Sequence, residues 1–300
     1  MNAKEAVERA FEKQTIIPAF NIPYLPMMKP VVQAIIDENS VCMVQVARVE
    51  WEKFQAESIE AVALEYEKYK DPAHTLLHLD HVPVIDEDLQ QVDYIPLLQR
   101  AIKAGYQSMM IDASRLDFEG NIKATQNAAA IAHDADIPLE AELGSVMGHE
   151  SEGVPPYEEI FASKQGFTDV KQARIFAKES GCDWLSVAVG SIHGAVAEGM
   201  KDRKKPEARL DIEHIKLLKE AVGLPLVLHG GSGIQKEYIM EGIKNGIAKI
   251  NVGTEIRQAY EQALAKTQDV SAAQQATYDK TVSVIKDFFE ISNNKDFLFG

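Results

Sequence analysis

The stretch Thr75-Leu76-Leu77-His78-Leu79-Asp80-His81 is an apolar run that ends in side chains able to titrate or to bind a metal ion. Short apolar runs of this kind are typical of strands buried inside a parallel sheet. Parallel α/β folds place their chemistry beyond the carboxyl ends of such strands. The stretch therefore predicts a buried strand with Asp80 and His81 at its functional end.

Similar apolar runs occur along the rest of the chain, and stretches with a helical spacing of apolar residues separate them. The other runs cover residues 16–21, 41–46, 106–112, 137–142, 183–189, 224–229 and 247–251. Helices are expected at residues 27–38, 51–69, 88–104, 121–133, 169–179, 211–222 and 235–245. Apolar strands that alternate with helices at intervals of roughly 30 residues predict a closed parallel sheet, the (β/α)8 TIM barrel.

The length of 300 residues suits one such barrel followed by a tail. We place the barrel and its chemistry in residues 1–265 and a C-terminal helical tail in residues 266–300. Val282, Ile285 and Phe288 fall near one face of a helix-like stretch in this tail. Such a face is suited to capping the barrel or to contacting another subunit.

Composition narrows the class of protein. A formal net charge of −15 argues against a nucleic-acid surface, which needs clustered positive charge. The only cysteines, Cys42 and Cys182, lie in separate segments and support neither a disulfide framework nor a cysteine metal site. No apolar run approaches the ~20 residues that span a bilayer. We therefore expect a soluble, cytoplasmic protein with no nucleic-acid or membrane partner.

Polar residues stand at or just beyond the end of every predicted strand, and a barrel would bring them to one mouth. They are Asn21, Gln45, Asp80, His81, Asp112, Glu142, His193, His229 and Asn251. Three imidazoles with an open fourth position make a catalytic zinc site. The sequence therefore predicts Zn2+ held by His81, His193 and His229.

Glycine-rich segments follow the last two predicted strands, and each leads into a helix. They read Gly230-Gly231-Ser232-Gly233 and Asn251-Val252-Gly253-Thr254. Barrels commonly hold phosphate at this place with backbone N–H groups and a helix N-terminus. A phosphate site is therefore favoured over glycines that serve only a turn. A long loop rich in glycine and proline after residue 144 is expected to be functional or mobile.

Six motifs in order resemble the class II, zinc-dependent ketose-bisphosphate aldolases, the family of fructose- and tagatose-bisphosphate aldolases. The likeness covers about residues 3–265. The motifs are His78-Leu79-Asp80-His81, Met110-Ile111-Asp112-Ala113-Ser114, Glu140-Ala141-Glu142-Leu143-Gly144, Gly190-Ser191-Ile192-His193-Gly194, Leu228-His229-Gly230-Gly231-Ser232-Gly233 and Lys249-Ile250-Asn251-Val252-Gly253-Thr254.

This resemblance implies retro-aldol cleavage of a ketose bisphosphate, such as fructose or tagatose 1,6-bisphosphate, to dihydroxyacetone phosphate and an aldehyde through a zinc-stabilised enediolate. Asp80 would act as acid/base at the C4 hydroxyl, and Glu150 would move the C3 proton. Asp112 and Glu142 would lie near the zinc and contact a second or displaced metal. The substrate and its phosphate would be held by Asn21, Gly194, Gly230, Gly231, Ser232, Asn251, Val252, Gly253 and Thr254. A monovalent cation (Na+ or K+) and a homodimer or homotetramer are also implied.

Departures from the family pattern leave the far end of the substrate open. Arg115 stands where a histidine is common, Arg48 closes the second strand, and a basic run covers residues 201–205. The distal group could thus be a phosphate, sulfonate or carboxylate. A metal-dependent epimerase or isomerase of a sugar acid is the alternative activity, because an enediolate can be reprotonated without cleavage. A non-catalytic sugar-phosphate sensor is a third hypothesis.

Overall fold

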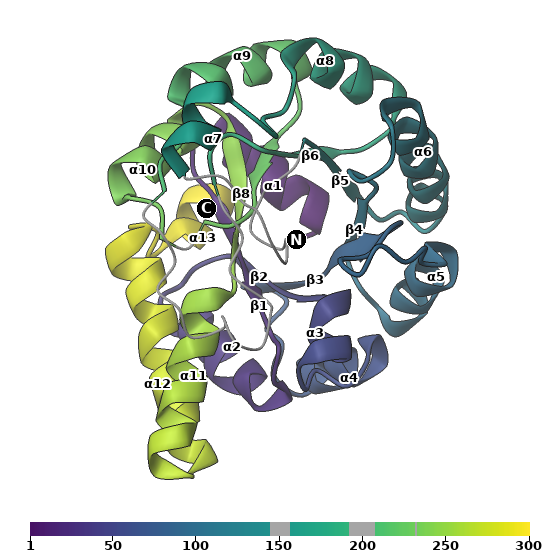
Figure 1. Ribbon diagram of the computed structural model, residues 1–300. Helices are drawn as coiled ribbons and strands as arrows, with labels where there is room; N and C mark the ends of the chain where they lie inside the picture. Colours follow the sequence, from purple (N-terminus) through teal and green to yellow (C-terminus); the bar gives the residue numbers. More distant parts are fainter. Residues whose placement is uncertain (145–156, 192–207, 232) are drawn as a thin grey trace.

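Eight parallel strands close into a barrel in which each strand pairs with the next and β8 pairs with β1. The computed structural model describes residues 1–144, 157–191, 208–231 and 233–300 (Figure 1). The strands are β1 Ile17–Asn21, β2 Cys42–Ala47, β3 Thr75–Pro83, β4 Ser108–Asp112, β5 Leu139–Leu143, β6 Trp184–Val187, β7 Leu226–Leu228 and β8 Ile247–Val252. The predicted (β/α)8 barrel is confirmed.

Helices form a ring around the strands, and the α11 and α12 pair extends beyond this ring (Figure 1). The main helices are α1 Ala3–Glu12, α2 Met28–Asp37, α3 Arg48–Lys53, α4 Ile59–Tyr69, α5 Tyr94–Ala104, α6 Phe118–Asp134, α7 Tyr157–Ser163, α8 Val170–Glu179, α9 Ile212–Val222, α10 Lys236–Lys244, α11 Thr254–Thr267 and α12 Val270–Ser283. Short helices are η1 Leu25–Met27, the π-helical turn η3 Val284–Phe288 and α13 Asn294–Phe299. Within the described part of the chain, no helix has the length and apolar character needed to cross a membrane.

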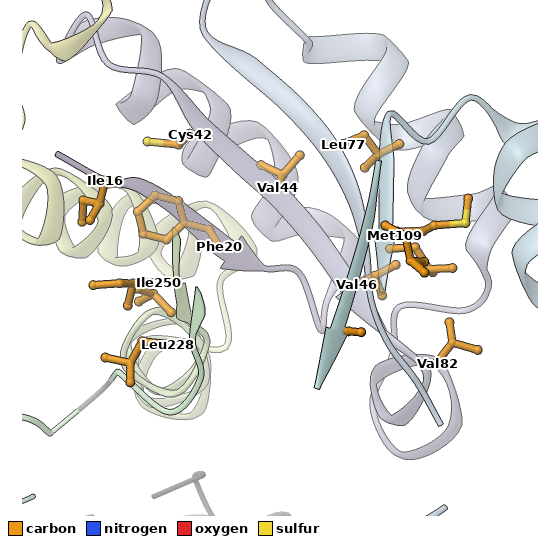
Figure 2. Close-up of a cluster of buried hydrophobic side chains, with 14 of the residues drawn as sticks. Ile16, Phe20, Cys42, Val44, Val46, Leu77, Val82, Met109, Leu228 and Ile250 are labelled. Carbon is orange, nitrogen blue, oxygen red and sulfur yellow. The ribbon is translucent and has the colours of Figure 1, made fainter. Parts of the chain in front are cut away.

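Alternate strand residues divide between two environments. Phe20, Val44 and Leu77 belong to the apolar layer between the strands and the surrounding helices (Figure 2). Their neighbours Ala19, Met43 and Leu76 belong to a second apolar cluster that includes residues of α1. Because successive strand side chains point to opposite faces, the first set faces the helices and the second fills the barrel. The amino-terminal end of the barrel is therefore a packed apolar plug.

Polar residues replace the apolar ones further along the same inward-facing rows. In β3 the row runs from Leu76 through His78 to Asp80, and all three are buried. Comparable steps of two residues place Glu140 before Glu142 in β5 and Lys249 before Asn251 in β8. The fold thus stacks an apolar plug, a buried charged layer and a polar mouth along one axis.

Two of the predicted helices differ most from the observed ones. Residues 51–69 form not one helix but α3 and α4, because Glu57 takes a positive φ of 66° and the Ser58 side chain caps α4 at the N–H of Ala61. Helix α5 begins at Tyr94 instead of residue 88, since Ile85 and Gln91 pair as an antiparallel bridge in the preceding loop. Neither error moves a strand.

The C-terminal helix α13 contributes to the plug at the amino-terminal end of the barrel. Leu298 is fully buried in the cluster that contains α1 residues. The guanidinium of Arg9 donates to the Leu298 carbonyl at 2.7 Å, and the Lys13 ammonium donates to the Phe297 carbonyl at 2.5 Å. The end of the tail is therefore part of the barrel core, as a capping role would require.

Replacing Leu298 with Ala is expected to lower the free energy of unfolding by about 2–4 kcal/mol, because it empties a fully buried site. Phe297, its neighbour in the same helix, is 54% exposed, so Phe297→Ala is the matched control and should cost less than about 1 kcal/mol. Urea unfolding of both variants measures the difference. Equal losses would mean that α13 does not close the barrel.

Candidate active site

A bulge near the end of β3 turns His81 toward the barrel mouth. The pairing of β3 with β4 shifts register between Leu79 and Val82, and His81 has a positive φ of 20°. Strict alternation would put His81 on the outer face, opposite to Asp80. The extra residue of a bulge re-aims a side chain, and it does so here at the cost of an uncommon backbone conformation. Both Asp80 and His81 consequently serve one site.

His81 and His229 come together from β3 and the end of β7. Their ring centroids lie 4.5 Å apart at an interplanar angle of 70°. Nδ1 of His81 lies 3.1 Å from an Asp112 carboxylate oxygen, and Nδ1 of His229 lies 3.2 Å from a Glu142 carboxylate oxygen. Four of the predicted metal-site residues thus converge from four different strands.

Two overlapping groups of side chains have the spacing of a metal site. Ligand atoms of Asp80, His81 and His229 all lie within 4.8 Å of one another, and so do those of His81, Asp112 and Glu142. Imidazole nitrogens and carboxylate oxygens are the ligands that Zn2+ takes besides cysteine. His229 and Glu142 are buried while His81 and Asp112 are partly exposed, so the cluster is open on one side. The donor set and the spacing fit a catalytic divalent ion.

Asp80 is held by three side-chain amides. Its carboxylate accepts hydrogen bonds from Nδ2 of Asn21, Nε2 of Gln45 and Nδ2 of Asn251, each at 3.0 Å. The residue is only 2% exposed. Three hydrogen-bond donors around a buried carboxylate favour its ionised form. Asp80 is therefore prepared to accept a proton from a bound molecule.

The charges of the site shift one another's pKa values. Burial alone would raise the pKa of Asp80, but the positive charges of His81 and His229 bring it below its ordinary value. Burial lowers the pKa of His81, but the Asp80 charge and the Asp112 hydrogen bond raise it to about 10. Among the described residues of the candidate metal cluster, carboxylates outnumber imidazoles, and this surplus of negative charge suits a bound cation.

The sequence reasoning missed a fully buried charged layer directly beneath the site. Its residues Lys249, Glu140 and His78 have no exposed surface, and neither has the predicted ligand His229. The Lys249 ammonium lies 2.9 Å from Glu140, whose other oxygen lies 2.8 Å from Nε2 of His229. Burial together with the nearby Lys249 charge lowers the pKa of His78 to about 3, so His78 is neutral. The sequence did carry a signal for these residues. Lys249, Glu140 and His78 each stand two positions before a predicted site residue and inside one of the six motifs.

Glu50 is a second residue that sequence reasoning did not single out. It lies in α3 immediately after β2 and is 7% exposed. Its carboxylate accepts from the backbone N–H of Ala47 at 2.8 Å. Burial raises the pKa of Glu50 to about 8, and the Asp80 charge adds to this rise. Glu50 is therefore a buried carboxylic acid that keeps its proton near neutral pH.

This buried acid predicts a pH-dependent stability. Between the ordinary pKa of 4.5 and the folded value of about 8, the unfolded chain ionises Glu50 while the folded chain does not, so stability falls as pH rises. Glu50→Gln keeps an acceptor for Ala47 and removes this loss. The free energy of unfolding of the variant, relative to that of wild type, should therefore rise by about 1–4 kcal/mol from about pH 5 to about pH 8. Urea unfolding at both pH values measures this gain, with Glu52→Gln at an exposed position of the same helix as control. A pH-independent difference would rule out the titration.

The predicted phosphate segments lie beside the site where the structure describes them. Gly231 follows β7, and a Cβ there would meet the Ile250 side chain at 2.6 Å, so only glycine fits. Gly253 lies against Asn21 and directly precedes α11, which begins at Thr254. Gly230 has a positive φ of 67°. The ends of β7 and β8 thus bring backbone N–H groups and a helix N-terminus to the mouth that holds Asp80.

The remaining predicted residues include several that the structure does not describe. Glu150, His193, Gly194, Ser232 and residues 201–205 lie outside the described part of the chain. Arg48 and Arg115 both contact Asp86 in the loop that follows β3. Arg48 pairs with the Asp86 carboxylate at 3.3 Å, and Arg115 donates to the Asp86 carbonyl at 2.7 Å.

The family described as fructose-bisphosphate aldolase class-II matches residues 1–296 of the chain. The chain belongs to this family. It is a class II aldolase, and therefore a lyase, from a family that typically depends on a metal. Residues Asp80, His81, Asp112, Glu142 and His229 of this aldolase make the cluster that could hold one.

Several solved structures are similar to this chain. The YdjI aldolase from Escherichia coli is similar with a TM-score of 0.74 and 28% identity over 95% of each chain. A Coccidioides immitis protein provisionally named a fructose-1,6-bisphosphate aldolase has a TM-score of 0.77 and 23% identity, over 99% of this chain and 98% of its own. Fructose-bisphosphate aldolase from Campylobacter jejuni has a TM-score of 0.71 and 17% identity, over 96% and 94%. The last two likenesses concern the fold alone.

Proposed function

We propose that this class II aldolase is zinc-dependent and cleaves a phosphorylated ketose to dihydroxyacetone phosphate and an aldehyde. The observation that carries the proposal is the meeting of His81, His229 and the amide-bound Asp80 at one barrel mouth. Zn2+ would be held by His81 and His229, with His193 as third ligand and Asp112 or Glu142 beside it. When bound, the ion would supply a Lewis acid for the substrate's ketone oxygen.

The protein residues would supply proton transfer and orientation. Asp80, ionised and fixed by three amides, would take the C4 hydroxyl proton as the bond between C3 and C4 breaks. Fixing the base in advance spares the cost of ordering it during the reaction. Glu150 is proposed to move the proton at C3. The orientation of the Asp80 carboxylate is therefore central to the proposed cleavage.

Substrate anions would be met by local donors, because the chain as a whole is acidic. The phosphate of the dihydroxyacetone phosphate half would bind at Gly230, Gly231 and Gly253 with the N-terminus of α11. A monovalent cation at these loops and a homodimer or homotetramer complete the proposal.

A screen of ketose phosphates tests the proposal. It includes fructose and tagatose 1,6-bisphosphate, and it follows triose phosphate release together with product NMR. Two fragments from at least one ketose are expected, and the expected activity disappears after chelation and returns with zinc. A single isomeric product would support the epimerase instead. Zinc-loaded protein that binds ketose phosphates but converts none of them would support a sensor.

A further inference from the structure

A buried ion pair lies beneath the proposed metal site and has no evident structural purpose. Lys249 of β8 and Glu140 of β5 face each other at 2.9 Å across the barrel interior, and neither side chain has exposed surface. Removing two charges from water is costly, and well-packed apolar residues often replace such pairs without loss of stability. Packing alone therefore does not explain these residue types, and their remaining contacts identify a different role.

Glu140 fixes the orientation of His229. Its Oε1 lies 2.8 Å from Nε2 of the imidazole. A carboxylate beside an ammonium can only accept, so Nε2 of His229 must carry the hydrogen. Nδ1, on the other side of the ring, then faces Glu142 at 3.2 Å in the predicted metal cluster. Metal-bound histidines typically rest on such a second partner, which sets the tautomer and the ring plane.

Lys249 fixes the side-chain amide of Asn251 in the same way. Its ammonium donates to Oδ1 of Asn251 at 2.7 Å. Because lysine has no acceptor, the oxygen of this amide must point toward Lys249. The amide nitrogen therefore points the other way, where it donates to Asp80 at 3.0 Å. Without the ammonium, the amide could turn and present its oxygen to the Asp80 carboxylate.

We propose that Glu140 and Lys249 are positioning residues that jointly set the metal-binding nitrogen of His229 and the hydrogen-bond donor of Asp80. The contacts run without a break from His229 through Glu140, Lys249 and Asn251 to Asp80. One buried pair thus aligns a ligand from β7 with the proposed base from β3. The metal part of this inference rests on the proposed function.

The test measures zinc affinity, separately from turnover, by competition with a fluorescent chelator. Glu140→Gln should weaken zinc binding by about 10–100-fold. The new amide can rotate and donate a hydrogen bond to Nε2 of His229. The ring hydrogen then lies on Nδ1, the nitrogen that would bind the metal. Lys249→Met should lower kcat by about 10-fold or more with little change in KM, since Asp80 loses a fixed donor. The visible spectrum of the Co2+ form should change for Glu140→Gln.

The controls separate positioning from folding. The double variant Glu140→Gln with Lys249→Met leaves no unpaired buried charge. It should therefore fold even if one of the single variants does not. Its zinc affinity should still be lower than that of wild type. Ser108→Ala removes a buried hydroxyl in the same layer that contacts only His78 among these residues, and it should keep wild-type zinc affinity. Thermal unfolding without metal monitors the fold of each variant.

The outcomes also distinguish this inference from the proposed function. Zinc affinity equal to wild type in both Glu140→Gln and the double variant overturns the inference, whatever reaction the enzyme catalyses. Weakened affinity in a protein that cleaves no ketose phosphate supports the inference and overturns the proposed reaction. Wild-type protein that binds no zinc overturns both.

Discussion

Replacing Asp80 with Asn is expected to lower kcat/KM for the cleaved ketose phosphate by about 10²–10⁴-fold, the usual contribution of a general base. The amide is nearly the same size but cannot take a proton. It would also bring an NH2 group toward three amide donors that now bind the carboxylate. Steady-state cleavage assays measure the loss, and chelator competition measures zinc affinity beside it, because a ligand atom of Asp80 also lies in the candidate metal cluster.

Asp183→Asn is the matched control for this substitution. Asp183 is also a largely buried aspartate, but it binds Lys4 and His133 at the amino-terminal end of the barrel. Its replacement should cost stability and leave kcat/KM within about threefold. Turnover of Asp80→Asn close to that of wild type on every cleaved substrate would exclude Asp80 as the base.

Replacing His229 with Ala should weaken zinc binding by more than about 100-fold, because second-shell partners alone contribute about 10–100-fold. His229 is fully buried and lies next to His81. Chelator competition measures the affinity, and cleavage should fall with it. His133→Ala, at the opposite end of the barrel, should keep wild-type affinity. Full zinc binding by His229→Ala would remove this residue from the ligand set.

The strands and their order could be predicted because a strand buried on both faces has a nearly continuous apolar sequence. Residues 41–44, for example, are apolar throughout, and polar groups follow at Gln45 and Arg48. The break between α3 and α4 was missed although Ser58 is a good N-cap, because the apolar spacing continues across it. The turn at Glu57 and Ser58 divides the helix that the apolar spacing predicted.

The proposed site was only partly visible in the sequence. Polar residues at strand ends predicted the meeting of His81, His229, Asp112 and Glu142, since the fold brings these ends together. The bulge that turns His81 inward depends on pairing between strands and leaves no local signal. The amide contacts of Asp80 and the pair of Lys249 with Glu140 depend on distances across the barrel, which a linear pattern does not encode.

The most direct test of the account is anomalous diffraction at the zinc edge from crystals grown with one equivalent of Zn2+. The account predicts a single strong peak at about 2.0–2.1 Å from ring nitrogens of both His81 and His229. A peak elsewhere, for example beside His133 and Asp183 at the other end of the barrel, or no peak at all, would contradict it.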